Sequence, residues 1–278
     1  MSSQMETRLK KRYGQHFLRD TGMIARIVGF IGPRPDDLLV EIGAGDGALS
    51  IRLAPKVLRL VALEIDREVI PALERGLAPY GNAEVIGGDI LKINLPDLLT
   101  PRLGPGITLR IAGNLPYNIG TAIIEILLAL ALPIKDMAFM LQLETARRIV
   151  AAPGSGEYGY FSVLCQHHCA VNLGFQVPPA CFVPRPRVTS AMVSLKPKDS
   201  PGDREFEEAF KSLAKAAFAY RRKKIVNSLG RCPQIGPAVG ELLGKAGIDG
   251  ARRAEDLTVA EYERLAHIYR ATGKSGGG

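Results

Sequence analysis

Short apolar runs alternate with segments of helical periodicity over most of the chain. The runs predict strands at 38–42, 60–65, 83–86, 107–112 and 136–141, and the periodic segments predict helices at 48–53, 67–77, 119–130 and 142–151. Such alternation is typical of βαβ units, in which helices connect parallel strands and cover the sheet. Two further runs, 175–183 and 190–195, are expected to close the sheet on either side of a proline-rich turn. The pattern predicts an α/β fold.

The pattern changes at residues 196–202, where lysine, proline, serine and glycine form a candidate linker. Beyond it, Phe206, Phe210, Leu213 and Ala217 recur at helical spacing. We therefore predict a second, all-helical domain over 201–278, ending in a short glycine-rich tail that we expect to be disordered.

The composition agrees with a folded chain whose ends are basic. Hydrophobic residues make up 46% of the 278 positions and charged residues 23%, which excludes a largely disordered protein. The net charge of +8 is unevenly placed: residues 1–20 carry five basic and two acidic side chains, and residues 201–278 carry fourteen and ten. Basic ends on a nearly neutral body indicate contact with a polyanion, although a solvated basic surface explains the same excess.

Nothing in the sequence predicts export or insertion into a membrane. No apolar leader opens the chain, and the longest apolar run, 119–134, contains Glu125 and is too short to span a bilayer. The four cysteines are too few and too irregularly spaced for a disulfide framework. We expect a cytoplasmic protein.

A glycine-rich turn follows the first predicted strand and opens a helix. Gly43, Gly45 and Gly47 let a ligand approach the backbone, because a Cβ would collide with it. Glu64 ends the next strand, where a carboxylate can accept the hydroxyls of a ribose. The turn predicts a nucleoside-containing cofactor. It leaves NAD and S-adenosylmethionine both open, because Gly43, Gly45 and Ala48 also satisfy a dinucleotide-binding pattern.

Asp89 and the tetrapeptide that begins at Asn114 separate these two cofactors. Asp89 ends the third strand and can accept a hydrogen bond from an adenine amine, although a helix N-cap is its other interpretation. An enzyme that methylates an adenine amine can hold both amine hydrogens, and the side-chain oxygen of Asn114 with the carbonyl of Leu115 or Pro116 suits this task. Tyr117 offers a ring for base stacking, worth about 1–3 kcal/mol. These residues favour methyl transfer to adenine.

Six segments, taken in order, resemble those of the KsgA-type adenine dimethyltransferases, which act on small-subunit ribosomal RNA. The segments are 14–18, 40–47, Glu64, 88–90, 114–117 and 182–190. The resemblance covers residues 8–270. It implies a Rossmann-like sheet of an S-adenosylmethionine-dependent methyltransferase over residues 1–200, with its basic N-terminal segment, and a small C-terminal helical domain that binds RNA over 201–278.

The resemblance also implies a role for each matching residue. The cofactor would be held by Gln15, His16, Leu18, Glu41, Gly43, Gly45, Glu64, Ile65, Asp89, Ile90 and Asn114. Catalysis would depend on Asn114, Leu115, Pro116, Tyr117 and Phe182. Phe182 would stack on the target base from the face opposite Tyr117, unless it is a core residue. Many relatives carry Asn at the position of His16, and both side chains donate a hydrogen bond.

The basic residues then have an expected partner. RNA phosphates would be bound by Arg8, Lys10, Lys11, Arg12, Arg185, Arg187, Arg221, Arg222, Lys223 and Lys224. The last four have a solvated helix end as their alternative interpretation. We expect a monomer that binds small-subunit RNA or an immature small ribosomal subunit, dimethylates two adjacent adenosines in the 3′-terminal hairpin, and takes part in subunit biogenesis.

Three alternatives remain open. Erythromycin-resistance methyltransferases share the layout but act on large-subunit RNA and usually carry Ile at the position of Leu115, so Leu115 favours the small-subunit branch. An NAD-dependent dehydrogenase would leave the tetrapeptide from Asn114 without a role. A ribosome-assembly factor without catalysis would have no need of Glu64, Asp89 and Asn114 together.

A zinc site is suggested by Cys165, His167, His168 and Cys169, with Cys181 as a further ligand. The spacing is not that of two Cys-x2-Cys pairs, and these residues continue an apolar run. The sequence therefore favours buried thiols and predicts no metal.

Overall fold

The structure, a computed structural model, describes residues 16–198, 202–220 and 222–273. Its contacts divide the chain into two units. The first comprises Met1–Ala146 and Asn172–Pro197, and the second comprises Arg147–Val171 and Lys198–Gly278. One boundary falls in the predicted linker. The assignment of Arg147–Val171 to the second unit was not predicted, because no change in composition marks that segment.

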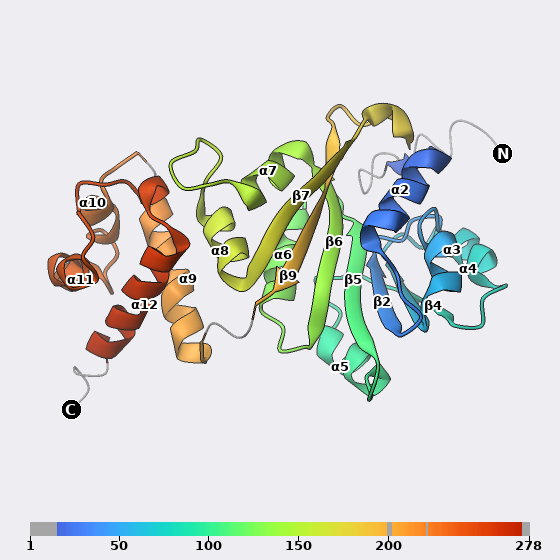
Figure 1. Cartoon of the computed structure of the whole chain (residues 1–278), viewed down its shortest axis with the longest axis horizontal. Helices are drawn as coiled ribbons and strands as arrows, with labels where there is room; N and C mark the ends of the chain where they lie inside the picture. Colours follow the sequence, from blue (N-terminus) through green and yellow to red (C-terminus); the bar gives the residue numbers. More distant parts are fainter. Residues whose placement is uncertain (1–15, 199–201, 221, 274–278) are drawn as a thin grey trace. The chain divides into compact units, whose positions relative to one another are not determined.

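A seven-stranded sheet has the strand order β4-β3-β2-β5-β6-β9-β7 (Figure 1). Its strands are β2 (Asp37–Ile42), β3 (Arg59–Glu64), β4 (Ala83–Gly87), β5 (Thr108–Asn114), β6 (Ile134–Gln142), β7 (Cys169–Val177) and β9 (Ser190–Pro197). The pairs from β4 through β6 are parallel, and β9 runs antiparallel to β6. The structure confirms a mostly parallel sheet of alternating strands and helices.

One predicted strand, 175–183, has the wrong extent. β7 ends at Val177, and a separate two-residue strand, β8 (Phe182–Val183), pairs antiparallel with β1 (Phe17–Leu18). Pro178 and Pro179 interrupt the run and begin a short 3-10 helix, Pro179–Cys181, because proline cannot donate to a strand ladder.

Helices connect the strands and form most of the second unit. Their bounds are α2 (Thr21–Ile31), α3 (Ser50–Leu53), α4 (Ile70–Leu77), α5 (Leu95–Leu99), α6 (Gly120–Leu128), α7 (Leu143–Val150), α8 (Tyr160–His168), α9 (Arg204–Phe218), α10 (Ile225–Leu229), α11 (Val239–Ala246) and α12 (Val259–Gly273). No helix among the described residues has the length and apolar character needed to cross a bilayer.

Helices α2, α3 and α4 lie together beside β2, β3 and β4 (Figure 1). Ile27, Leu53 and Leu73 of these helices share one buried cluster with Leu39 and Leu60 of the sheet. All six residues of β2 are buried, as expected for a central strand of a sheet covered on both faces. Burial on both faces explains why this strand is a continuous apolar run in the sequence.

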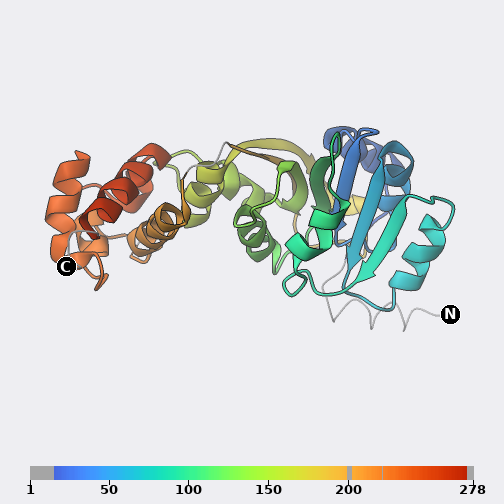
Figure 2. The same cartoon turned by 90° about the horizontal axis from the view of Figure 1, so that it is seen from below.

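The second unit has its own core, in which α9, α11 and α12 pack together (Figure 2). Phe206, Phe210, Leu213 and Ala217 are all buried in it. The structure therefore confirms the helical periodicity found after the linker.

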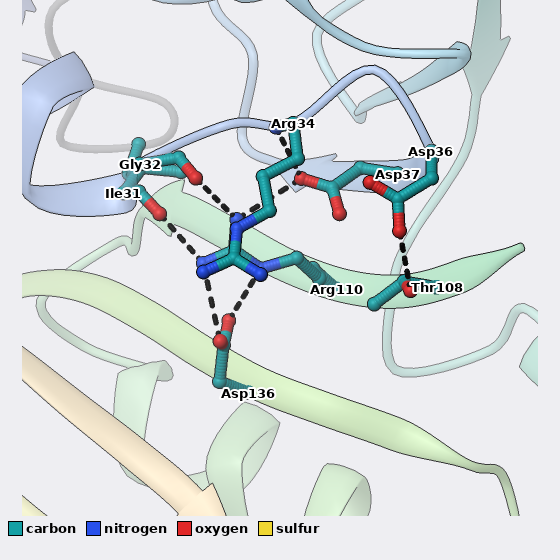
Figure 3. A network of polar contacts seen from close by, with 8 residues as sticks. All are labelled: Ile31, Gly32, Arg34, Asp36, Asp37, Thr108, Arg110 and Asp136. Atoms are coloured by element: carbon teal, nitrogen blue, oxygen red, sulfur yellow. Dashed lines mark hydrogen bonds and ion pairs between the residues drawn. The ribbon is translucent and has the colours of Figure 1, made fainter.

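A polar network anchors the amino ends of the central strands (Figure 3). The guanidinium of Arg110 on β5 donates to the fully buried Asp37 of β2 at 3.0 Å and to Asp136 of β6 at 2.8 and 3.1 Å. Its remaining donors bind the carbonyls of Ile31 and Gly32 at the end of α2, at 2.6 and 2.7 Å. One arginine thus compensates a buried carboxylate, satisfies helix-terminal carbonyls and joins three strands to a helix.

Replacing Arg110 by alanine should lower the free energy of unfolding by about 3–5 kcal/mol, because Asp37 would stay buried without its cation. The matched control is Arg102→Ala, which removes the pair with the more exposed Glu84 and should cost about 0–1 kcal/mol. Urea unfolding followed by circular dichroism measures both losses. Equal losses in the two variants would contradict the role given to Arg110.

Candidate active site

A pocket in the first unit lies at the carboxyl ends of β2, β3, β4 and β5. Its lining includes Gly43, Glu64, Asp89, Asn114 and Tyr117, which follow or end four different strands. Ligands of parallel sheets bind at this edge. The structure therefore brings together the residues that the sequence analysis selected separately.

The glycine turn after β2 adopts backbone angles that favour glycine. Gly43 and Gly45 have φ values of +73° and +58°. A Cβ on Gly43 would lie 3.1 Å from the carbonyl oxygen of Asn114, and one on Gly45 would lie 3.5 Å from the ring of Phe17. Neighbouring atoms therefore lie close to the glycine turn on two sides. Because the turn has no Cβ atoms at these positions, a ligand can approach its backbone closely.

Glu64, which is 4% exposed, holds the glycine turn in place. Its carboxylate accepts hydrogen bonds from the backbone N–H groups of Gly45 at 2.7 Å and of Ile65 and Asp66 at 2.9 Å. Burial raises the pKa of Glu64, and these three donors oppose that rise. Because each carboxylate oxygen has two lone pairs, Glu64 can still accept a ribose hydroxyl.

Glu41, on β2, is buried beneath the pocket and accepts a hydrogen bond from the hydroxyl of Ser50 at 2.5 Å. Burial raises its pKa to about 8, so the carboxyl group is mostly protonated at neutral pH. A cationic group bound beside it would favour the carboxylate form.

Asp89 and two isoleucines line the other end of the pocket. One oxygen of Asp89 accepts the N–H of Leu91 at 3.0 Å and stabilises the turn after β4. No helix begins there, because the N-cap of the next helix, α5, is Asn94, so the alternative interpretation of Asp89 as a helix N-cap is wrong. Ile65 and Ile90 lie on the same lining, where two apolar side chains can enclose a flat ring. The set offers apolar contact together with a carboxylate oxygen for an adenine amine.

The loop after β5 is held by backbone hydrogen bonds. The N–H of Leu115 donates to the carbonyl of Met140 at 3.1 Å, and the carbonyl of Pro116 accepts the N–H of Ile119 at 3.2 Å. The Asn114 side-chain nitrogen donates to the carbonyl of His16 at 3.4 Å. This orientation leaves the Asn114 side-chain oxygen as an acceptor.

Tyr117 is positioned by a residue that the sequence analysis did not select for this role. Its hydroxyl lies 2.6 Å from the hydroxyl of Ser190, which is fully buried at the start of β9. Burial raises the pKa of Tyr117, which therefore stays a neutral phenol at physiological pH. Ser190 is the last residue of the 182–190 segment, and its distance along the chain from Tyr117 hides the contact.

The segment that begins at His16 lies over the glycine turn. The Nδ1 of His16 donates to the carbonyl of Pro184 at 2.8 Å, and its ring centroid lies 5.8 Å from that of Tyr117. Phe17 and Leu18 line the pocket beside His16. Arg19 forms an ion pair with Asp46 of the glycine turn. Phe17 and Arg19 were missed: Phe17 lies within the 14–18 segment but was given no role, and Arg19 lies just beyond that segment.

Phe182 does not line the pocket, contrary to the expectation that it stacks on a target base. It is 1% exposed and packs in the core beside Leu18, its partner in the β1–β8 pair. A buried ring has no face to offer a base, and the alternative interpretation of Phe182 as a core residue describes this arrangement. The burial arises from a pairing across the chain that local sequence does not reveal.

The predicted RNA-binding residues divide among three places. Five of them lie outside the described residues: Arg8, Lys10, Lys11, Arg12 and Arg221. The same holds for one predicted cofactor residue, Gln15. Arg185 and Arg187 are exposed on the first unit, and Arg222, Lys223 and Lys224 are exposed on the second. Arg231, which was not predicted, lines a small hollow with Lys223 and Asn227.

The three cysteines of the suggested zinc site, Cys165, Cys169 and Cys181, are buried thiols. Burial raises the pKa of Cys169 to about 12, which disfavours the thiolate that zinc binds.

Comparison with known proteins identifies the family. The family model described as ribosomal RNA adenine dimethylase matches residues 6–271. This chain belongs to that family.

Similar proteins support the assignment. The chain is 42% identical over 259 residues to "Ribosomal RNA small subunit methyltransferase A" of Chromohalobacter salexigens, covering 93% of this chain and 90% of the relative. It is 40% identical over 270 residues to the protein of the same name from Shouchella clausii, covering 95% and 90%.

Among solved structures, the 23S rRNA methyltransferase ErmE has a TM-score of 0.66 at 28% identity, covering 90% of this chain and 98% of that chain. A dimethyladenosine transferase from Plasmodium falciparum has the same fold, with a TM-score of 0.79 at 22% identity over 93% and 98% of the two chains. These findings confirm the predicted family, the methyltransferase fold, the class of enzyme and its use of S-adenosylmethionine.

The protonation of Glu41 predicts a pH-dependent affinity for the cofactor. Between pH 6 and 8, affinity for S-adenosylmethionine should rise with pH, by up to about tenfold per unit, because a cation binds the carboxylate form and releases the proton held with a pKa of about 8. Isothermal titration in buffers of different ionisation enthalpy measures both the affinity and the proton released.

The control is Glu41→Gln, which keeps the size and the hydrogen-bonding capacity but cannot titrate. Its affinity should be flat over the same range, with no proton released. A flat profile in the unsubstituted protein would show that Glu41 does not sense the bound cation.

Proposed function

We propose that this chain transfers methyl groups from S-adenosylmethionine to the exocyclic amines of two adjacent adenosines in the 3′-terminal hairpin of small-subunit ribosomal RNA. The observation that carries the proposal is the meeting of two loops in one pocket: the glycine turn at Gly43 touches the acceptor loop at Asn114. The 42% identity to a small-subunit methyltransferase over most of both chains supports this RNA over the large-subunit alternative.

The pocket fits the cofactor in its shape and in its donor and acceptor groups. Gly43 and Gly45 provide the backbone cradle, Glu64 and Asp89 provide acceptors for the ribose and the adenine, and Glu41 provides a carboxylate for the methionine ammonium. When bound, S-adenosylmethionine supplies an electrophilic methyl group on a sulfonium.

Two acceptors in the loop after β5 would orient the target amine. Asn114 offers its side-chain oxygen, because its nitrogen is engaged by His16. Of the two candidate carbonyls, that of Pro116 already accepts from Ile119, whereas that of Leu115 has no backbone partner among the described residues. We assign the two amine hydrogens to Asn114 and the Leu115 carbonyl, which aims the lone pair into the pocket.

The chemistry then needs alignment more than acid–base catalysis. The amine nitrogen forms a bond to the methyl carbon as the carbon–sulfur bond breaks, and the methylated nitrogen, now strongly acidic, loses its proton to water. Holding the reacting groups in line can supply about 7–11 kcal/mol. The target base must leave its stack to reach the pocket. Tyr117, fixed by Ser190, gives that base a ring to stack on.

The exposed basic residues would hold the RNA through its phosphates. Arg185 and Arg187 follow β8 of the first unit, and Lys223 and Arg231 line the hollow of the second. Such contacts position an RNA without reading its sequence. We also propose that the enzyme acts as a monomer on an immature small ribosomal subunit. It would take part in the biogenesis of that subunit in the cytoplasm.

The proposal is tested with purified protein, S-adenosylmethionine and immature small subunits that lack the methyl groups. Mass spectrometry of the digested RNA should find dimethyladenosine at two neighbouring positions. Asn114→Ala should lower the rate at least about 100-fold, a loss typical of a removed transition-state contact, while calorimetry shows cofactor affinity close to that of the unsubstituted enzyme.

The matched control is Asn172→Ala, an exposed position on β7, which should keep full activity. Methylation only of large-subunit RNA would move the chain to the resistance branch. Tight RNA binding without any methyl transfer would replace the proposal with an assembly factor. Normal rates in Asn114→Ala would refute the amine-orienting role.

Neutralising the basic residues should weaken RNA binding and its salt dependence together. For Arg185→Gln/Arg187→Gln and for Lys223→Gln/Arg231→Gln, the slope of log affinity against log salt should become shallower by about 0.7–0.9 for each phosphate that the variant no longer neutralises. Filter binding over a salt series measures the slope. Lys245→Gln, an exposed lysine paired with Glu241, is the control and should leave the slope unchanged.

A further inference from the structure

Two adjacent histidines at the end of α8 face a glutamate of α9 inside the second unit. His167 is fully buried, and its Nε2 lies 3.2 Å from Oε1 of Glu207. His168 Nε2 lies 3.3 Å from Oε2 of the same carboxylate. The ligand atoms of the three side chains lie within 4.8 Å of one another.

Two of these polar atoms lack the hydrogen bonds that burial demands, whereas His167 Nε2 is hydrogen-bonded to Glu207 Oε1. His168 Nε2 and Glu207 Oε2 are both buried and neither has a hydrogen-bond partner. Unsatisfied buried polar atoms are rare in folded proteins and call for a missing partner.

His167 is oriented from its other side. Its Nδ1 lies 2.8 Å from Oε1 of Glu263 on α12, and its ring is stacked on Phe210 at a centroid distance of 3.8 Å. This contact with Glu263 fixes the ring so that Nε2 faces Glu207. Metal-bound histidines are held in this way, with the second nitrogen donating to a carboxylate.

The distances from the Glu207 carboxylate to the two histidines are close to those between metal ligands, and all three ligand atoms lie within 4.8 Å of one another. A tetrahedral zinc ion has ligand distances of about 2.0–2.2 Å, which place neighbouring ligand atoms about 3.3–3.5 Å apart. The distances from Glu207 to His167 and His168 are 3.2 and 3.3 Å. The side chains of His168 and Glu207 remain 11% and 19% exposed, although the facing atoms Nε2 and Oε2 are themselves buried.

The surrounding charges partly favour a cation. Glu207 and Glu263 bring two carboxylates, whereas Lys198 and Lys211 act on the cluster as cations. The ammonium of Lys198 is directed to the carbonyl of Gln166 at 2.6 Å. The two lysines lower the affinity for a metal but leave the three ligand atoms available.

We propose that His167, His168 and Glu207 bind one divalent transition-metal ion, zinc in the first instance, with Glu263 as the residue that positions His167. Two imidazoles and one carboxylate are a ligand set that zinc accepts. The ion would link α8 to α9, and through Glu263 to α12, and so stabilise the second unit. The inference is independent of the methyl-transfer proposal and places the metal on the histidines rather than on the cysteines.

The test uses the full chain without a polyhistidine tag, stripped with a chelator and dialysed against buffered zinc. One zinc per chain should be recovered, and zinc should raise the unfolding temperature. Cobalt in place of zinc should give visible absorption typical of a four-coordinate site, without the near-ultraviolet band of a thiolate ligand.

Substitution of the proposed ligands tests whether these residues bind the ion. Glu207→Gln and His168→Gln should each lower zinc affinity at least about 100-fold, and Glu263→Gln about 10- to 100-fold. Glu208→Gln, exposed on the same helix and paired with Arg204, is the control and should bind zinc normally. Circular dichroism verifies that each variant is folded, and two independent ligand variants keep the test valid if one is not.

Three results would overturn the proposal. The stripped protein could take up no stoichiometric zinc. The folded Glu207→Gln and His168→Gln variants could bind zinc as tightly as the unsubstituted chain. Cobalt could show a thiolate band, which would move the ion to the cysteines.

Discussion

The close backbone approach between β2 and β5 is the constraint on which the pocket depends. A Cβ on Gly113 would lie 2.2 Å from the carbonyl oxygen of Ile42, so no other residue fits where these strands end. The chain continues from these positions into the glycine turn and into the acceptor loop, whose backbones also nearly touch at Gly43 and Asn114. The cofactor cradle and the residues that face the target amine are therefore neighbours because of backbone packing, before any side chain contributes.

Local sequence was sufficient to predict the central strands and the functional residues in the turns that follow them. The apolar run of β2, the glycines after it, Glu64 at the end of β3 and Asp89 after β4 were each found from local sequence, and the three polar or glycine positions line one pocket. Their placement follows from strand order and direction, which the alternation of strands and helices largely dictates. The amino-end network of Arg110 gave no such signal, because its charged members Asp37, Arg110 and Asp136 lie on three separate segments.

The differences between the predicted and the observed site come from contacts between segments that lie far apart in the chain. The burial of Phe182 and the position of Ser190 beside Tyr117 depend on segments far apart in the chain. In the second unit, Glu207 approaches the two histidines from 40 positions away, so ligand spacing near Cys165 gave no sign of this cluster. A pattern within one segment predicts an element and its buried face, but not which distant segment covers that face.

The cover of the pocket is fastened much more weakly than the sheet beneath it. Within the described residues, the segment 16–18 is held by a two-residue ladder, a few single hydrogen bonds, an exposed ion pair between Arg19 and Asp46, and the one side chain, Leu18, that enters the core. Local opening of such a segment requires far less free energy than global unfolding. Placing two methyl groups on one amine consumes two cofactor molecules, so a spent one must leave before the second transfer. We therefore expect its release to require opening of the short β1–β8 ladder at the rim, while the strands beneath the pocket stay folded.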